Sequence, residues 1–388
     1  MIRTAGRHTR HAIGEMVKMY GPTRVVYNLG IVPYAKQKRV ALVYLSRVHD
    51  KVIYNDEKVF HPSIAQHTVM LQQLLALGYI VDVYNCSGDK PYNFPRQATY
   101  DAIIGFGPFY MRLCQLSPSA MKILYITENA PWVVREKFAQ RMKYHKKLFG
   151  HEDFTIRRND FYTDQMFDIS DAGIAMTGSH NIVRMQERLA GIVRIDANAL
   201  PNPSFDIGKK DFDAARNRFV WFGSRGLIHK GLDILIEAFR ELPHYQLTIY
   251  GAPASELRGW KLPPNVINRG KIEVMSRQYI DDVVMSHAFT LSLSCSEGMQ
   301  TGIATCMMSG LIPLVTPETG YDDCPHALHF NGWSCEEVVR RINECASISF
   351  TQLRNRSEQV RTYAMEHYTD KAFGHNFNKT VKLLLQDN

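Results

Sequence analysis

The sequence predicts an α/β protein made of two Rossmann-like domains, each built around a parallel sheet. Its 388 residues, 45% of them hydrophobic, suit two cores of ordinary size better than one. Short runs rich in Val, Ile and Tyr alternate with helical patterns, as is typical of βα units. This alternation breaks once, near residues 200–218, and then starts again.

The first domain is expected at residues 39–205. Its best-defined helix is predicted at residues 64–77, where Ser63 and Gln66 suit a capping box and Gly78 suits a left-handed exit. Its expected strands are residues 39–46, 80–86, 101–107, 121–127 and 172–177.

A charged linker at residues 206–217 is expected to lead into the second domain, residues 218–370. The pattern of residues 351–385 is helical, and we expect residues 371–388 to form a C-terminal helix that could pack back on the first domain. The expected strands of the second domain are residues 218–222, 246–250, 266–269, 289–293 and 312–315.

The net charge of +8 is concentrated in residues 1–40, with eight Lys or Arg against one acid, so residues 1–38 are expected to form a basic arm. Such an arm could rest on anionic lipid headgroups or lie in solvent. The basic helical segment 133–147 could likewise face an anionic acceptor or solvent, and solvent is favoured. Nucleic-acid binding would need basic residues interleaved with stacking aromatics, and no segment beyond residue 40 shows this pattern.

Seven scattered cysteines without a Cys-x-x-Cys pair indicate neither a disulfide framework nor a zinc site. The N-terminal segment lacks an apolar stretch of signal-peptide length, and no long apolar run suggests a membrane span. We therefore expect a cytoplasmic protein, with the inner membrane face as a further location. Asp211 and Asp213 form an Asp-x-Asp sequence, but it precedes a strand, so no metal site is expected.

The segment 218–231 predicts a strand, a short loop and the start of a helix. Unpaired amides and the helix dipole make such a loop a phosphate site. Arg225 and Lys230 add two charges there, which can neutralise a departing nucleoside diphosphate. We expect replacement of either residue by Ala to lower turnover about a hundredfold with little loss of folding stability.

This loop resembles the donor-phosphate loop of retaining GT-B glycosyltransferases of the large group 1 (family 4-like) class. In that class Gly-Arg-Leu is followed by three variable residues, then by Lys-Gly and a Leu-Leu-Ile-Glu-Ala helix. Aligned on Lys230, the arginine of the class falls on Arg225 and its glycine on Ser224, with Gly223 one residue earlier. The resemblance implies that Arg225 and Lys230 bind the diphosphate of a UDP- or GDP-sugar, with no separate cofactor.

Residues 289–317 resemble the Glu-Gly loop and small-residue helix of the same class, in which two glutamates stand eight positions apart. Glu297 matches the first, which contacts the donor sugar, and Gly298 permits close backbone approach. Thr305 replaces the second, a ribose ligand. Its hydroxyl can still hydrogen-bond a ribose, but the charge-assisted bidentate contact of the glutamate, worth about 1–3 kcal/mol, is lost. We expect Thr305→Glu to tighten nucleotide binding. The other donor-binding candidates of this segment are Met299, Gln300, Thr301 and Gly302.

Two further turns agree with a nucleotide site but are common loop sequences. Gly251 ends a strand where the nucleotide lies in the class, and the segment formed by Gly270, Lys271 and Ile272 matches the one whose backbone contacts the base.

The acceptor is expected to bind the first domain, where the resemblance is weaker. Glu128, a catalytic candidate, and Asn129 follow a predicted strand at the sheet edge where α/β proteins bind ligands. His61 and His67 are further candidates, although a histidine on a helix surface such as His67 is more often structural.

The resemblance implies transfer of a sugar to a glycan or lipid-linked acceptor with retention, without metal or protein nucleophile. By the same resemblance, the product is a bacterial surface polysaccharide. Two alternatives stay open: a nucleotide-sugar epimerase on the same scaffold, and a non-catalytic nucleotide-sugar-binding partner subunit, which the loss of glutamate at position 305 would suit.

Overall fold

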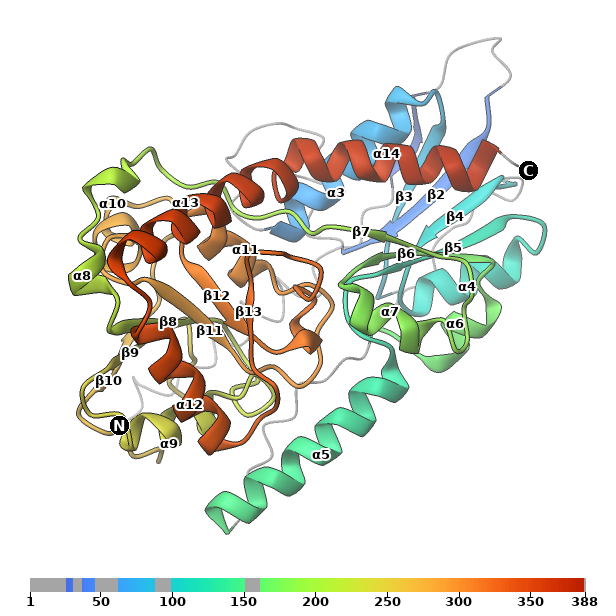
Figure 1. The fold of residues 1–388 in the computed structure, drawn as a ribbon. Coiled ribbons are helices and arrows are strands. Elements are labelled where there is room, and N and C mark those ends of the chain that lie inside the picture. Colours follow the sequence, from blue (N-terminus) through green and yellow to red (C-terminus); the bar gives the residue numbers. More distant parts are fainter. Residues whose placement is uncertain (1–25, 31–36, 46–61, 88–98, 151–160, 387–388) are drawn as a thin grey trace, which may run out of the picture. The chain divides into compact units, whose positions relative to one another are not determined.

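A computed structural model describes residues 26–30, 37–45, 62–87, 99–150 and 161–386 (Figure 1). The chain divides into two compact units. The first comprises Met1–Tyr125, Asp160–Ala172 and Phe377–Asn388, and the second comprises Ile126–Asn159 and Gly173–Asn376. Within the described ranges, no helix is both long and apolar enough to cross a membrane.

The first sheet has the strand order β1-β3-β2-β4-β5-β6-β7. β2 pairs in parallel with β3 and β4, whereas β1 runs antiparallel to β3. Every residue of β3 and β4 is buried, as expected for a sheet covered on both faces. The five predicted strands are confirmed, and β1 and β7 were not predicted. The strands are β1 (Val26–Leu29), β2 (Arg39–Tyr44), β3 (Ile80–Asn85), β4 (Ala102–Gly105), β5 (Met121–Ile126), β6 (Ala172–Met176) and β7 (Ile192–Ile195).

The helices up to residue 185 are α3 (Pro62–Ala76), α4 (Pro108–Leu116), α5 (Pro131–Phe149), α6 (Asp164–Ile169) and α7 (Ser179–Met185), of which α5 and α7 belong to the second unit. The predicted capping box of α3 is wrong, because the helix already begins at Pro62. The side-chain oxygen of Gln66 instead accepts a hydrogen bond from the hydroxyl of Tyr44 at 2.9 Å. The predicted exit is confirmed, since Gly78 has a φ of +83°.

The second sheet has the order β10-β9-β8-β11-β12-β13, with parallel pairing throughout. When the strands are numbered 1 to 6 along the chain, their order across the sheet is 3-2-1-4-5-6, which is the Rossmann arrangement. The connection changes direction between β8 and β11, and such a switch point is where α/β sheets bind ligands. All five predicted strands are confirmed, and β13 was not predicted. The strands are β8 (Arg218–Phe222), β9 (Gln246–Tyr250), β10 (Val266–Gly270), β11 (Phe289–Ser292), β12 (Ile312–Val315) and β13 (Leu328–His329).

The final helical stretch consists of two helices, because the chain leaves the helical path at Tyr368. The second of them, α14, reaches the first unit, where Asn378 Nδ2 donates to Gln73 Oε1 at 3.0 Å. The helices of this half are α8 (Phe212–Ala215), α9 (Leu232–Arg240), α10 (Arg277–Tyr279), α11 (Thr301–Met308), α12 (Cys335–Ala346), α13 (Phe350–His367) and α14 (Asp370–Gln386).

Candidate functional site

The loops that follow β8, β9 and β10 meet at the carboxyl edge of the second sheet. Gly251 has a φ of +82°, and a Cβ atom there would lie 2.0 Å from the carbonyl oxygen of Gly223. The amide of Gly251 also donates to the carbonyl of Gly270 at 2.7 Å. The structure therefore brings these three predicted glycines together, and the backbones approach as closely as only glycine permits.

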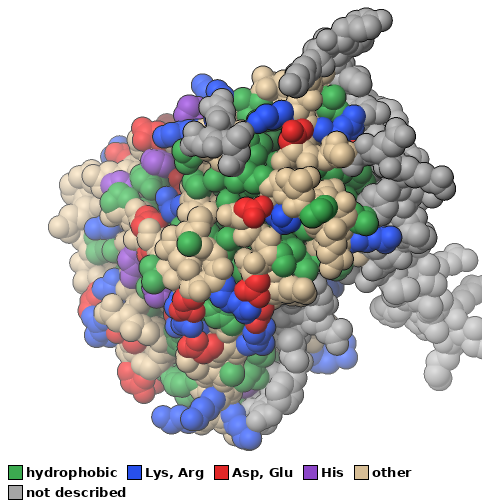
Figure 2. Space-filling view, turned by 90° about the vertical axis from the view of Figure 1, so that its right-hand side faces the viewer, with side chains coloured by type: hydrophobic (Ala, Val, Ile, Leu, Met, Phe, Trp, Pro, Cys, Tyr) green, Lys and Arg blue, Asp and Glu red, His purple; other side chains and the backbone are tan. Residues whose placement is uncertain are grey.

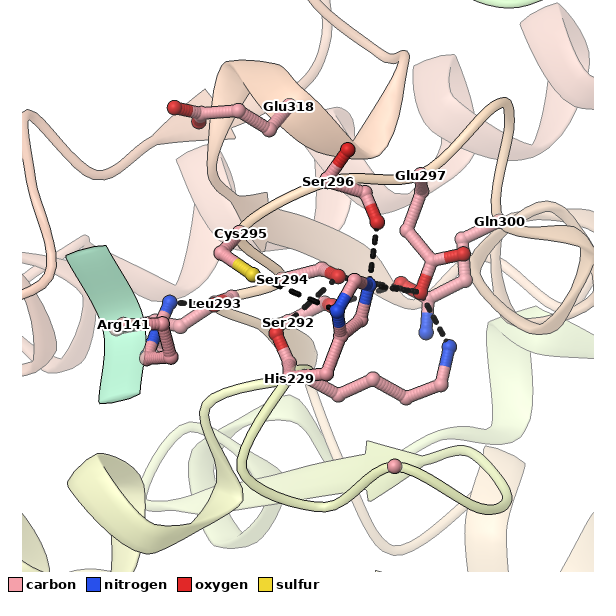
Figure 3. Close-up of polar contacts among 12 residues, drawn as sticks. Arg141, His229, Ser292, Leu293, Ser294, Cys295, Ser296, Glu297, Gln300 and Glu318 are labelled. Atoms are coloured by element: carbon pink, nitrogen blue, oxygen red, sulfur yellow. Dashed lines mark hydrogen bonds and ion pairs between the residues drawn. The ribbon is translucent and has the colours of Figure 1, made fainter. Parts of the chain in front are cut away.

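Lys230 and Glu297 form an ion pair between the loops that follow β8 and β11. Both residues are only 5% exposed. The hydroxyl of Ser294 donates to Oε1 of Glu297 at 3.1 Å, and Nε2 of His229 lies 3.8 Å from the same oxygen. Two of the strongest sequence candidates thus meet at the switch point of the sheet, and Figure 3 shows Glu297 among its polar neighbours.

His229, which the sequence analysis did not select, connects the same two loops. Its Nε2 contacts the carbonyl oxygen of Ser296, so this nitrogen must carry the ring hydrogen. Its Nδ1 lies 3.5 Å from Sγ of Cys295, and burial raises the pKa of this thiol to about 11, which keeps it protonated and able to donate. Figure 3 shows the ring directed toward Ser296 and Glu297. The residue was missed because it stands at a variable position of the motif.

Arg225 and Ser224 lie exposed on the loop between β8 and α9. Glu256 holds this loop: its Oε2 accepts hydrogen bonds from the amides of Gly226 at 2.9 Å and Leu227 at 3.2 Å. Arg225 therefore presents its side chain to solvent, whereas Lys230 of the same loop is buried.

The Glu297 loop is fixed by tight backbone contacts. A Cβ atom on Gly298 would lie 2.4 Å from the carbonyl oxygen of Thr127 and 2.9 Å from that of Met176. Met299 Sδ accepts from the amide of Ala197 at 3.1 Å. Gln300 Oε1 accepts from the hydroxyl of Ser292 at 2.7 Å. Met299 and Gln300 are buried, so their side chains brace the loop.

Helix α11 begins at Thr301 without a side-chain N-cap, and its second residue, Gly302, approaches the end of β8. A Cβ atom on Gly302 would lie 3.0 Å from the carbonyl oxygen of Phe222. The amino end of the helix therefore lies at the switch point, where its dipole favours an anion.

Thr305 lies deeper in the same helix and is 2% exposed. Its hydroxyl donates to the carbonyl of Thr301 at 2.9 Å and accepts from the amide of Leu200 at 3.2 Å. The donor and one acceptor position of this hydroxyl are thus engaged within the fold, and a contact with ribose stays a prediction.

Beyond β10, Lys271 is exposed and Ile272 packs against a core cluster that contains Tyr250 and Val274. The sequence predicted that the backbone of these residues contacts the base. The positions of their side chains do not test this role, which stays a prediction.

Asn129 is connected to the Glu297 loop through Asn181, a residue that the sequence analysis missed. Nδ2 of Asn129 donates to Oδ1 of Asn181 at 2.9 Å, and Nδ2 of Asn181 lies 3.1 Å from the carbonyl oxygen of Glu297. Glu128, the residue before Asn129 in the sequence, is half-buried. The predicted acceptor residue Asn129 therefore braces the proposed donor loop.

The histidine candidates lie elsewhere. His67 is completely buried in the first unit, and its ring stacks on that of Tyr44 at 5.4 Å. The expectation of a surface position is therefore wrong, because the helix turns this residue toward the sheet, and a structural role fits it better. His61 lies outside the described residues.

The first aspartate of the Asp-x-Asp sequence, Asp211, has a structural role. Oδ1 of Asp211 accepts from the amide of Ala214 at 3.0 Å and caps α8. In the described part of the chain, no group of three His, Cys, Asp or Glu residues could hold a metal ion.

Comparisons with known proteins identify the fold. No protein-family model and no curated protein matches the sequence. Among solved structures, sucrose-phosphate synthase from Thermosynechococcus elongatus matches with a TM-score of 0.60 and 12% identity, over 91% of this chain and 100% of that one. Anabaena Alr3699/HepE in complex with UDP and glucose matches with a TM-score of 0.54 and 11% identity, over 89% and 100%.

WaaG, a glycosyltransferase involved in lipopolysaccharide biosynthesis, matches with a TM-score of 0.53 and 15% identity, over 89% of this chain and 99% of that one. The chain spans 59% of the length of its match in the GtfA/B complex, which has a TM-score of 0.50 and 16% identity. The fold is therefore GT-B, and the prediction of two Rossmann-like domains is confirmed.

Proposed function

We propose that this chain is a glycosyltransferase that uses a UDP- or GDP-sugar as donor. The observation that carries the proposal is the buried pair of Lys230 and Glu297 at the switch point between β8 and β11. A buried ion pair costs several kcal/mol of desolvation per charge, so it is a poor device for stability alone. A nucleotide-sugar gives each charge a second partner, the diphosphate for Lys230 and a sugar hydroxyl for Glu297. HepE, which shares the fold, is described in complex with UDP-glucose.

In the proposed reaction the bond between the anomeric carbon and the diphosphate breaks, and the acceptor oxygen bonds to that carbon on the same face. The diphosphate leaves with the bonding electron pair and takes up the proton of the acceptor hydroxyl. Lys230, the exposed Arg225 and the amino end of α11 stabilise the growing negative charge. Glu297 orients the sugar, and neither a metal nor a protein nucleophile takes part.

The proposed acceptor is a glycan or a lipid-linked glycan of a bacterial surface polysaccharide, with the enzyme in the cytoplasm or at the inner membrane face. Residues 1–40 would supply contacts with anionic lipid, and most of them lie outside the described residues. On the face shown in Figure 2, Lys and Arg are interspersed with Asp and Glu, without a continuous basic surface among the described side chains.

The test is donor hydrolysis by the full chain with UDP- and GDP-sugars, compared with Lys230→Met. Slow release of nucleoside diphosphate by the wild-type protein, lost in the variant, supports the transferase. The anomer of the released sugar, read by NMR before mutarotation, tests retention. Isomerised donor without sugar release would indicate the epimerase.

A non-catalytic nucleotide-sugar-binding subunit is the second candidate. The specific observation in its favour is Thr305, which stands in place of a glutamate and whose hydroxyl bonds within the fold. Nucleotide binding without turnover of any donor would support this candidate against the transferase.

A further inference from the structure

Helix α5 was expected to face solvent, but one side of it is buried within the second unit. The polar residues of this side are spaced by four positions and so lie on one helix face. Each contacts a different segment around the Lys230–Glu297 pair. The contacts join Lys137 to Glu318 at 3.1 Å, Arg141 to the carbonyl of Leu293, and His145 to Asp233 at 2.7 Å.

Arg141 occupies the junction of the two loops that carry the pair. Its Nη2 donates to the carbonyl of Leu293, immediately after β11 and four residues before Glu297. A Cβ atom on Gly231, the residue after Lys230, would lie 2.9 Å from Nη1 of Arg141 and 2.7 Å from the oxygen of Leu293. The guanidinium therefore lies against both loops, and Figure 3 shows it at the carbonyl of Leu293.

An arginine is costly at this position. The residue is completely buried, and its Nε and Nη1 have no hydrogen-bond acceptor within the described ranges. Its guanidinium carbon lies 4.5 Å from the centre of the Trp333 ring, a contact that offsets part of the desolvation. An apolar side chain would fill the space without burying a charge. What it could not supply is a donor for the carbonyl of Leu293, which lies beyond the last residue of β11.

We propose that Arg141 is a positioning residue of the donor site. By holding the end of β11 against Gly231, it sets the separation of Glu297 from Lys230. Its importance for sugar transfer rests on the proposed function, whereas its effect on the ion pair does not.

The experiment measures the rate at which each lysine of the full chain is acylated by a small reagent, read by mass spectrometry. Lys230 should react slowly in the wild-type protein, because it is buried and paired with Glu297. In Arg141→Gln the rate at Lys230 should rise about tenfold, the factor that corresponds to losing one charged hydrogen bond. Lys210, a second buried lysine that bonds to the carbonyl of His287, is the internal reference and should not change.

Two variants complete the test. Arg141→Lys keeps a cationic donor and should retain most of the protection of Lys230. Tyr144→Phe is the matched control on the same helix: it removes a hydroxyl that accepts from the amide of Cys335 at 3.2 Å, and it should leave Lys230 unchanged. An unchanged rate at Lys230 in Arg141→Gln would overturn the proposal. An equal rise at Lys210 and Lys230 would also overturn it, because it would reveal general loosening.

Nucleotide binding separates this proposal from the proposed function. Calorimetric titration of the wild-type protein with UDP and GDP tests the donor site, whereas acylation needs no nucleotide. If neither nucleotide binds but Arg141→Gln exposes Lys230, the positioning role stands and the proposed function falls. If nucleotide binds and donor is hydrolysed, Arg141→Gln should lower kcat about tenfold, whereas Arg141→Lys should restore most of it.

Discussion

Lys230 and Glu297 stand 67 positions apart in the sequence and form one buried ion pair between neighbouring strand ends. The pair exists because the strand order places the end of β8 beside that of β11. It neutralises two charges that would otherwise be costly to bury. A donor that entered the site would have to share these charges, so binding and stability are coupled at this pair.

Removing one partner of the pair should therefore reduce stability as well as activity. We expect Lys230→Met to lower turnover about a hundredfold and the free energy of unfolding by about 3 kcal/mol, because the buried carboxylate of Glu297 loses its ion pair with Lys230. Because both residues are buried, this prediction replaces the expectation from sequence that stability would hardly change. Urea denaturation and donor hydrolysis measure the two effects.

The control is the double variant Lys230→Met/Glu297→Leu, which removes both charges. It should regain most of the lost stability while remaining inactive. A double variant that is less stable than Lys230→Met would contradict the role assigned to the pair.

Arg225 should behave differently from Lys230, because its side chain is exposed. Arg225→Ala should lower turnover about a hundredfold and leave the free energy of unfolding unchanged to within about 0.5 kcal/mol. Parallel measurements of kcat and of urea denaturation check both parts. Normal turnover in this variant would remove Arg225 from the phosphate site.

Thr305 offers a test that separates a ribose ligand from a structural residue. Its hydroxyl bonds to Thr301 and Leu200 within the fold, so Thr305→Val should lower the free energy of unfolding by about 1 kcal/mol. If the hydroxyl contacts only the protein, the Kd for UDP or GDP should stay constant. A several-fold weaker Kd would instead support the predicted contact with ribose.

The strands and the charged pair could be predicted from the sequence because both are encoded locally. The strands β8, β9, β11 and β12 of the second sheet are short, mainly apolar runs, and Lys230 and Glu297 stand in the loops that follow β8 and β11. β13 was missed because two residues carry too little pattern.

Residues that hold the site from a distance could not be predicted in the same way. Arg141 lies in a segment rich in Lys and Arg, a composition typical of a solvated helix face. Only its spacing of four from Lys137 and from His145 indicated a common face, and nothing local identified Leu293 as its partner. Asn181 and His229 were missed for the same reason, since their roles depend on contacts across the fold.

Gly298 should tolerate no side chain. A Cβ atom would lie 2.4 Å from the carbonyl oxygen of Thr127, and backbone atoms cannot yield easily. We expect Gly298→Ala to cost about 2 kcal/mol of unfolding free energy and to displace Glu297, so that donor hydrolysis falls as well. Gly332→Ala is the matched control, because no atom lies within 4 Å of a Cβ there, and it should be nearly neutral. Equal melting temperatures for the two variants would contradict this packing.

Lys210 should make stability depend on pH. Burial lowers the pKa of its amine to about 7, while the amine bonds to the carbonyl of His287. In the unfolded chain the pKa is about 10.4, so between the two values the unfolded chain binds more protons and stability rises with pH. The contribution should reach about 4 kcal/mol at pH 10 and be lost as the pH falls to 7.

The measurement for Lys210 is urea denaturation of the wild-type protein and of Lys210→Met between pH 7 and pH 10. The difference between their free energies of unfolding should change across this range in favour of the wild-type protein, because methionine keeps the packing but binds no proton. Two parallel curves would show that the amine titrates normally in the folded chain.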